Sequence, residues 1–129
     1  MSDLPIDLDK VRTFLDRKRE RTRRARAALL EQAQSDARAI IERIAQAHDP
    51  QRIYQWGSLV ETGHFTELSD IDIALEGLRG AEEYFAIVGE VMGMTAFPLD
   101  IIELEKVGAE TAEGIRRRGR IVHEAKGNR

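Results

Sequence analysis

Asp70 and Asp72 are the residues whose type and spacing most clearly permit chemistry, because they alternate with apolar residues in the segment Asp-Ile-Asp-Ile-Ala-Leu. This alternation is typical of a β-strand, in which successive side chains point to opposite faces. We therefore expect both carboxylates on one face, while Ile71 and Ile73 point into the core. Two like charges this close repel each other unless a cation lies between them. Hard oxygen ligands that converge on one point suit Mg²⁺ or Mn²⁺.

Asp100 is a third candidate ligand, because it lies in a second apolar segment, Leu99–Leu104, that also predicts a strand. If the two strands are adjacent, Asp100 can reach the same cluster as Asp70 and Asp72. Three carboxylates on one sheet face can hold two divalent ions, which activate an attacking oxygen and neutralise charge on a transferring phosphoryl group. Glu103 is the competing acid, but it belongs to the opposite face and we expect it at the surface.

Gly57 and Ser58 follow the expected strand Arg52–Trp56 directly and predict the other half of a site. A glycine after a strand lets the backbone come close to a ligand. The helical turn expected next offers free N–H groups to an anion, and the Ser58 hydroxyl adds a hydrogen bond to phosphate. Phosphate binding beside paired carboxylates is the arrangement that a metal-bound nucleoside triphosphate needs.

The elements that must position these residues follow from apolar periodicity and from proline and glycine signals. In chain order we expect a helix over 7–46, a strand over 52–56, a helical turn over 59–63, a strand over 70–75, a helix over 81–92, a strand over 99–104, a helix over 108–118 and a short strand over 120–124. A break of the first helix near Gln34–Asp36 stays open, with Ser35 or Asp36 as a new N-cap. This order predicts an α/β or α+β fold with helices packed on a small sheet.

Length and composition bound the class of protein. The chain has 129 residues, of which 42% are hydrophobic and 33% are charged, so we expect one domain with an appendage. The absence of cysteine excludes disulfides, thiolate zinc sites and cysteine nucleophiles. No apolar run approaches the length of a membrane span, and the opening residues do not look like a signal peptide. We therefore expect a cytoplasmic protein without a membrane segment.

Charge is distributed unevenly along the chain. Residues Lys10–Arg26 hold nine bases and two acids, residues 61–113 hold thirteen acids and two bases, and residues 116–129 hold six bases and one acid. The first segment is a solvated helix face, a docking surface for an acidic partner or a contact for nucleic acid. Phe14 is its one aromatic neighbour, which weakens the case for single-stranded nucleic acid. The apolar stripe Leu8–Leu15 predicts self-association or burial against a partner.

The spacing of these motifs resembles the minimal nucleotidyltransferase domain of the polymerase-beta-like nucleotidyltransferase superfamily. Gly57-Ser58 is followed after eleven residues by Asp70-Ile-Asp72, and later by Leu99-Asp100-Ile-Ile. The resemblance covers roughly residues 35–124 and includes Ser69 and the final Gly-Arg-Ile-Val. It implies a mixed sheet with helices on one side, Asp70 and Asp72 as metal ligands, and Asp100 as the third carboxylate that helps to activate the nucleophile. Residues 1–34 would then be a basic helical extension of a domain over 35–129.

The resemblance also implies a function. Many such minimal domains are antitoxins of HEPN-domain toxins, and the active ones move AMP from ATP to a tyrosine of the toxin. We therefore expect a Mg²⁺-dependent protein adenylyltransferase in which Gly57 and Ser58 hold the β- and γ-phosphates. Two departures favour an alternative, a weak or inactive module that neutralises a toxin by contact: the spacer has eleven residues where ten are usual, and Glu61 stands where an arginine is frequent. A nucleic-acid-binding regulator that uses the basic helix is a third hypothesis.

Overall fold

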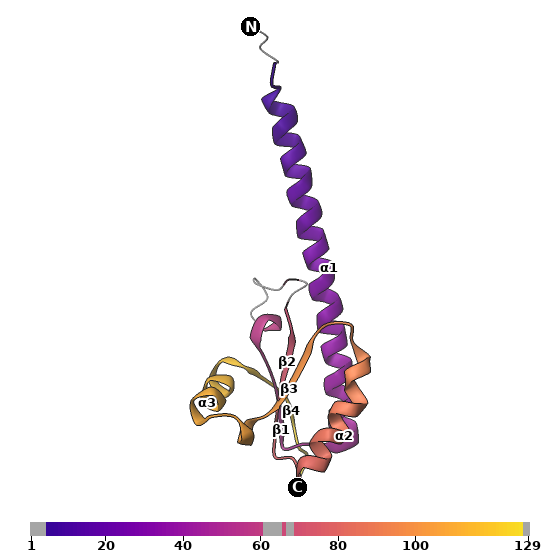
Figure 1. Ribbon diagram of the computed structural model, residues 1–129, viewed down its shortest axis with the longest axis vertical. Helices are drawn as coiled ribbons and strands as arrows, with labels where there is room; N and C mark the ends of the chain where they lie inside the picture. The colour runs from indigo at the N-terminus through magenta and orange to yellow at the C-terminus, as the bar shows by residue number, and fades with distance from the viewer. Residues whose placement is uncertain (1–4, 61–65, 67–68, 128–129) are drawn as a thin grey trace.

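A four-stranded mixed sheet forms the centre of the protein, whose computed structural model describes residues 5–60, 66 and 69–127 (Figure 1). The helices are α1 (Leu8–His48), α2 (Ala81–Val91) and α3 (Ala109–Arg118), and the strands are β1 (Arg52–Trp56), β2 (Ile71–Glu76), β3 (Leu99–Glu103) and β4 (Arg120–Glu124). Short 3-10 turns cover Gly57–Leu59, Met92–Met94 and Leu104–Lys106. The expected helices and strands are therefore confirmed, with small shifts at their ends, whereas most of the helical turn expected over 59–63 lies outside the described residues.

The strand order is β3-β2-β1-β4. Strand β1 runs antiparallel to both β2 and β4, and β2 runs parallel to β3. A parallel pair needs a crossover connection, and α2 supplies it between β2 and β3. This crossover brings Asp72 and Asp100 into adjacent strands, which is the condition that the sequence left open.

Both faces of the sheet are covered. Helices α1 and α2 pack on one face, over a cluster that contains Ile53, Ile71 and Ile73, whereas α3 packs on the other face with Tyr54 and Ala74 (Figure 1). The expectation of helices on one side only is therefore wrong for α3. The physical reason is that alternate residues of β1 and β2 are buried on opposite faces, so each face needs its own apolar cover.

Helix α1 is continuous over 41 residues, so the break considered near Gln34–Asp36 does not occur. The Asp36 carboxylate does not cap a new helix, because it accepts hydrogen bonds from Gln32 Nε2 at 2.8 Å and from Thr95 Oγ1 at 2.7 Å. The Asp7 side chain caps the true start of the helix by accepting from two backbone N–H groups. The helix ends at Asp49, whose φ of 45° places it in the left-handed region.

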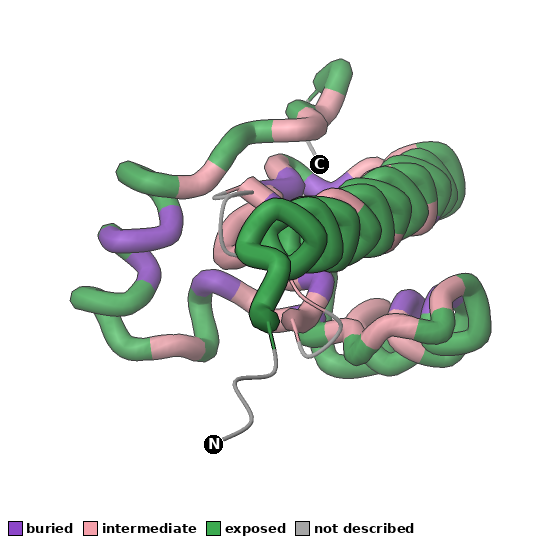
Figure 2. Tube along the Cα trace, turned by 90° about the horizontal axis from the view of Figure 1, so that it is seen from above, coloured by how far each residue is buried: buried purple, intermediate pink, exposed green. Residues whose placement is uncertain are grey.

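The two halves of α1 have different surroundings. The C-terminal half contributes Ala33, Ala37, Ile40, Ile41 and Ile44 to the core. The N-terminal half projects from the sheet and is exposed along almost its whole length (Figures 1 and 2). At about 1.5 Å per residue the whole helix spans roughly 60 Å. Among the described residues, no helix is both long enough and apolar enough to cross a bilayer.

Candidate active site

The carboxylates of Asp72 and Asp100 lie on neighbouring strands in direct register. Asp72 is the Cα partner of Asp100 across the β2–β3 pair, and of Trp56 across the β1–β2 pair. Ile71 and Ile73 are fully buried beneath α1 and α2, as the alternation predicts, so Asp72 belongs to the α3 face. Asp100, Asp72 and Trp56 therefore form a row across three strands on one face of the sheet.

The pKa of Asp72, the central residue of this row, is raised. Partial burial, together with the negative charges of Asp100 and Asp70, raises the pKa of the Asp72 carboxyl from its ordinary value of 3.8 to about 6, and burial is the largest of these causes. The three predicted site residues are therefore close enough to repel one another. A carboxyl group whose pKa is raised by burial and by like charges is frequent in functional sites.

The donor chemistry of these aspartates fits a divalent cation. Carboxylate oxygens suit Mg²⁺ or Mn²⁺, and the mutual repulsion at Asp72 is the charge that such an ion would neutralise. Among the described residues, however, no three acidic or histidine side chains converge closely enough to form a ready metal cage. Asp100 is exposed, so its carboxylate has room to move toward the other two. The ligand roles of Asp70, Asp72 and Asp100 thus stay predictions that the charges support.

Gly57 approaches Asp72 so closely that no side chain fits between them. Its φ of +76° lies in the left-handed region, and a Cβ atom built on it would overlap Asp72 Oδ2 and lie 3.1 Å from Asp72 Cγ. Gly57 opens a single 3-10 turn that ends at Leu59, where the Val60 N–H donates to the Gly57 carbonyl at 3.0 Å. The backbone therefore approaches the carboxylate row, as expected of a glycine that follows a strand.

The phosphate-binding roles of Gly57 and Ser58 also stay predictions. Ser58 is partly buried in the turn beside the carboxylate row. The rest of the expected helical turn, with Glu61 and the extra spacer residue near Thr62–Gly63, lies outside the described residues.

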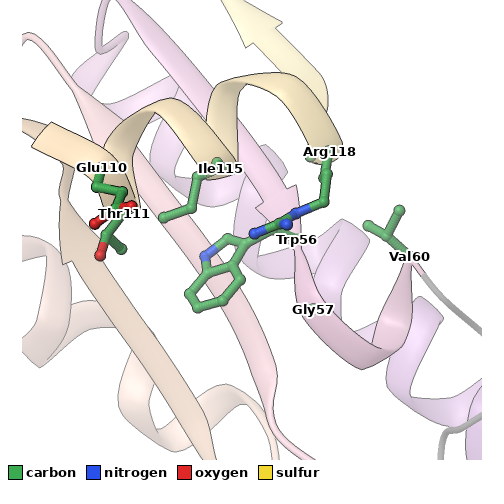
Figure 3. A pocket seen from close by; sticks show the side chains of 9 residues that line it. Trp56, Gly57, Val60, Glu110, Thr111, Ile115 and Arg118 are labelled. Carbon is green, nitrogen blue, oxygen red and sulfur yellow. The ribbon is translucent and has the colours of Figure 1, made fainter.

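A cavity of about 600 Å³ adjoins the row beneath α3 (Figure 3). Its lining residues are Trp56, Gly57, Val60, Glu110, Thr111, Gly114, Ile115, Arg118 and Gly119. The indole Nε1 of Trp56 is buried and has no hydrogen-bond partner in the described part of the chain. Trp56 packs in the α3 cluster and also forms one wall of this cavity.

Sequence reasoning missed the contribution of α3 to this cavity. The helix ends in three consecutive arginines, and only Arg118 lines the cavity. Helical spacing is the signal that distinguishes it, because positions 114, 115 and 118 share a face and Ile115 is buried against the sheet. The signal has this meaning only when the face of the sheet that α3 covers is known.

Two contacts hold α3 in place over the sheet. The buried Glu76 carboxylate at the end of β2 accepts from Arg52 Nη1 at 3.2 Å and from Arg116 Nη2 at 2.9 Å. Directly after α3, Gly119 lies so close to β1 that a Cβ atom there would be 3.2 Å from the carbonyl oxygen of Gln55. The end of α3 is therefore fixed relative to the Gly57 turn.

Comparison with known proteins agrees with this architecture. The family model described as "Polymerase beta, Nucleotidyltransferase" matches residues 38–128. A solved structure of a toxin–antitoxin with AMP-PNP is 16% identical, with a TM-score of 0.55, over 68% of this chain and 73% of that one. A structure described as a minimal nucleotidyltransferase is 18% identical, with a TM-score of 0.56, over 70% of this chain and 93% of that one. No curated protein matches the chain. The family match covers most of the chain, which therefore belongs to the polymerase beta nucleotidyltransferase family.

Proposed function

We propose that this protein transfers AMP from ATP to a hydroxyl group of a partner protein, and that it acts in the cytoplasm as the antitoxin of a HEPN-type toxin. One observation carries the catalytic part of this proposal. Asp72 and Asp100 are in register on adjacent strands, and the carboxylate of Asp72 lies directly against the backbone of Gly57. The residues predicted as metal ligands and the turn predicted to bind phosphate are thereby adjacent in a member of a nucleotidyltransferase family.

The site residues divide the chemistry between them. Asp70, Asp72 and Asp100 would hold Mg²⁺ or Mn²⁺, which supplies charge neutralisation at the transferring phosphoryl group. Gly57 and Ser58 bind the β- and γ-phosphates. The acceptor oxygen attacks the α-phosphorus, its proton passes to Asp100, and the bond to the β-phosphate breaks to release pyrophosphate. AMP is then joined to the acceptor through a phosphodiester bond.

A protein acceptor is favoured over a small molecule because the chain offers a large surface away from the site. The N-terminal half of α1 exposes Leu8, Val11, Phe14 and Leu15, with exposed fractions between 40% and 68%. Nine basic residues surround or follow this stripe. An apolar stripe with a basic margin suits an acidic, amphipathic partner surface. The toxin–antitoxin neighbour with AMP-PNP supports both a toxin partner and an ATP-like donor.

The same surface supports a second candidate function, in which the chain neutralises the toxin by contact and turns over slowly or not at all. This function requires only the exposed N-terminal half of α1 as a binding surface. It is favoured by the open arrangement of the carboxylates in the described residues and by Glu61 in the sequence after the turn.

Radiolabelled ATP distinguishes the two candidates. The full chain is incubated with [α-³²P]ATP, MgCl₂ and the protein encoded by the adjacent gene, beside the double variant Asp70→Asn/Asp72→Asn and the control Glu103→Gln. Label on the partner with wild type and Glu103→Gln, but not with the double variant, supports AMP transfer. A stable complex without label in any reaction supports neutralisation by contact and contradicts the enzymatic proposal.

A further inference from the structure

Arg118 is the basic side chain that lines the cavity beside Gly57. Its two neighbours on α3 are engaged or turned away, because Arg116 pairs with Glu76 and Arg117 is exposed and outside the cavity lining. Arg118 itself forms no ion pair with any described residue. The cavity wall therefore carries a guanidinium group whose charge is available to a ligand.

Gly114 allows Arg118 to take this position. The two residues are one helical turn apart, and a Cβ atom on Gly114 would lie only 2.9 Å from Arg118 Nη2. Any larger residue at position 114 would push the guanidinium group outward. Figure 3 shows the Arg118 side chain reaching from the end of α3 toward Trp56, on the side of the cavity where Gly57 lies.

The polar group of Trp56, beside Arg118, is a donor. Trp56 Nε1 is buried and has no partner in the described chain, whereas Thr111 lies beside Glu110 at the other end of the cavity (Figure 3). A buried N–H group without an acceptor is unfavourable, so a ligand that supplies acceptor atoms is favoured here. Glu110 is the one acid of the lining, and it lies at the end of the cavity away from Arg118 (Figure 3). The end near Gly57 is therefore suited to an anion.

The position of Gly57 gives the cavity its relation to the carboxylate row. Gly57 contacts the Asp72 carboxylate on one side and lines the cavity on the other. A nucleotide whose α-phosphate lies at Asp72 must pass its β- and γ-phosphates across Gly57. The described part of the turn, Gly57–Val60, contains no basic side chain, so a basic side chain that binds these phosphates beside the metal ions has to belong to another part of the chain.

We propose that the cavity beneath α3 is a polyphosphate subsite, in which Arg118 binds the terminal phosphates of the nucleotide and Trp56 Nε1 donates to a phosphate oxygen. The subsite also holds the pyrophosphate that leaves after transfer. This inference rests on the proposed function for the position of the α-phosphate, but its ligand chemistry can be tested without any transfer reaction. Gly114 is a positioning residue, because it leaves the space in which the Arg118 guanidinium group lies.

Trp56 is the single tryptophan of the chain, so its fluorescence reports directly on the cavity. We would titrate sodium tripolyphosphate, in buffer with MgCl₂, into the full-length protein. The wild type should show a saturable change in emission, with an affinity that falls as salt concentration rises. Arg118→Gln should weaken binding at least tenfold, whereas the matched control Arg117→Gln should stay within twofold of wild type. Arg118→Lys should restore part of the affinity.

Gly114→Ala separates positioning from folding. Alanine has a higher helix propensity than glycine, so this variant should unfold at the same or a higher temperature than wild type. Its affinity for tripolyphosphate should nevertheless fall several-fold, because the added methyl group displaces the guanidinium. A variant that keeps wild-type affinity would contradict the positioning role.

Two outcomes would overturn the subsite itself. One is equal affinity of Arg118→Gln and Arg117→Gln for tripolyphosphate, and the other is a Trp56 response to adenosine but not to tripolyphosphate. The proposed function fails independently: it fails if no AMP reaches a partner protein while Arg118-dependent tripolyphosphate binding persists. Transfer that proceeds equally well in Arg118→Gln, with no tripolyphosphate binding in wild type, rejects the subsite and leaves the proposed function standing.

Discussion

The carboxylate of Asp72 occupies the space that a side chain at position 57 would fill. A Cβ atom on Gly57 would overlap Asp72 Oδ2, and the positive φ of Gly57 disfavours any other residue there. The first residue of the turn and the central carboxylate of the row therefore constrain each other. A change at position 57 therefore alters the proposed metal-binding side and the proposed phosphate-binding side at once.

Gly57→Ala should reduce stability and activity together. We expect a loss of about 1–3 kcal/mol in the free energy of unfolding, because alanine is strained at this φ and displaces Asp72. AMP transfer should fall at least a hundredfold, measured with labelled ATP. Gly89→Ala is the matched control, since a Cβ there meets nothing within 4 Å. It should stabilise α2 by about 0.5–1 kcal/mol and leave transfer unchanged.

The raised pKa of Asp72 predicts a dependence of stability on pH in metal-free protein. The pKa is about 6 in the fold against an ordinary value of 3.8, so the folded state favours the neutral carboxyl. Its contribution to stability is complete below pH 4 and is lost as pH rises through about 6. Asp72→Asn should therefore stabilise the protein in EDTA at pH 7.5, by about 1–2 kcal/mol after allowance for solvent screening.

The same substitution should have little effect at pH 4, and urea unfolding at the two pH values measures the difference. Asp16→Asn, on the exposed part of α1, serves as the control and should show no such difference. Equal effects of Asp72→Asn at both pH values would contradict the raised pKa of the Asp72 carboxyl, to which burial contributes most and the charges of Asp100 and Asp70 contribute less.

Asp100 and Glu103 allow a test of which face of β3 is functional. Asp100 is in register with Asp72, whereas Glu103 is three positions along the strand and faces the other side of the sheet. Asp100→Asn should lower the rate of AMP transfer at least a hundredfold with an unchanged melting temperature, because it removes the proposed metal ligand and proton acceptor. Glu103→Gln should retain the rate within about threefold, and a comparable loss in both variants would argue against the assignment.

The ion pairs of Glu76 predict how much the attachment of α3 to the sheet contributes to the stability of the fold. Its carboxylate joins Arg52 of β1 to Arg116 of α3, and both pairs raise the pKa of the arginine concerned. Glu76→Gln should destabilise the protein by only about 1–2 kcal/mol, since both arginines are well exposed to solvent. Glu113→Gln, an exposed position of the same helix, should change stability by less than about 0.5 kcal/mol. Chemical denaturation of both variants measures the contrast.

Much of the candidate site could be predicted from sequence because its determinants are local. The alternation around Asp70 and Asp72 specifies which side chains share a face, and Ile71 and Ile73 are buried as expected. Strand limits were accurate to about one residue for the same reason. The adjacency of Asp100 stayed a condition in the sequence analysis, because it depends on the crossover by which α2 joins two parallel strands.

The features that sequence reasoning missed depend on contacts between distant residues. The continuity of α1 at Asp36 involves Thr95, which is 59 residues away along the chain. The position of α3 depends on the apolar surface that Tyr54 and Ala74 form on the second face of the sheet. Alanine is small enough that its burial is hard to anticipate from a hydrophobic pattern. The role of Arg118 follows only after that face is known.

The projecting half of α1 should tolerate substitutions that the other half does not. Val11→Glu and Leu15→Glu replace residues with exposed fractions of 45% and 40%, so the free energy of unfolding should stay within about 0.5 kcal/mol of wild type. Ile40→Ala, in the core half, should cost about 2–5 kcal/mol. If the arm docks the partner toxin, the two glutamate variants should lose at least tenfold in affinity by calorimetry. Wild-type affinity in both would place the interface elsewhere.

Because α1 is continuous, its length fixes the orientation of any partner that binds its exposed N-terminal half. Each residue of an α-helix is rotated by about 100° about the helix axis relative to the residue before it. Helix α1 is continuous from Leu8 to His48, so no break in it can compensate for a change in this rotation. One alanine inserted in the exposed half would rotate a bound partner to another side of the helix. Seven inserted residues would almost restore the original orientation of the partner and move it about 10 Å outward. For a partner bound to the N-terminal half of α1, the length of the helix therefore determines both its orientation and its distance relative to the carboxylate row.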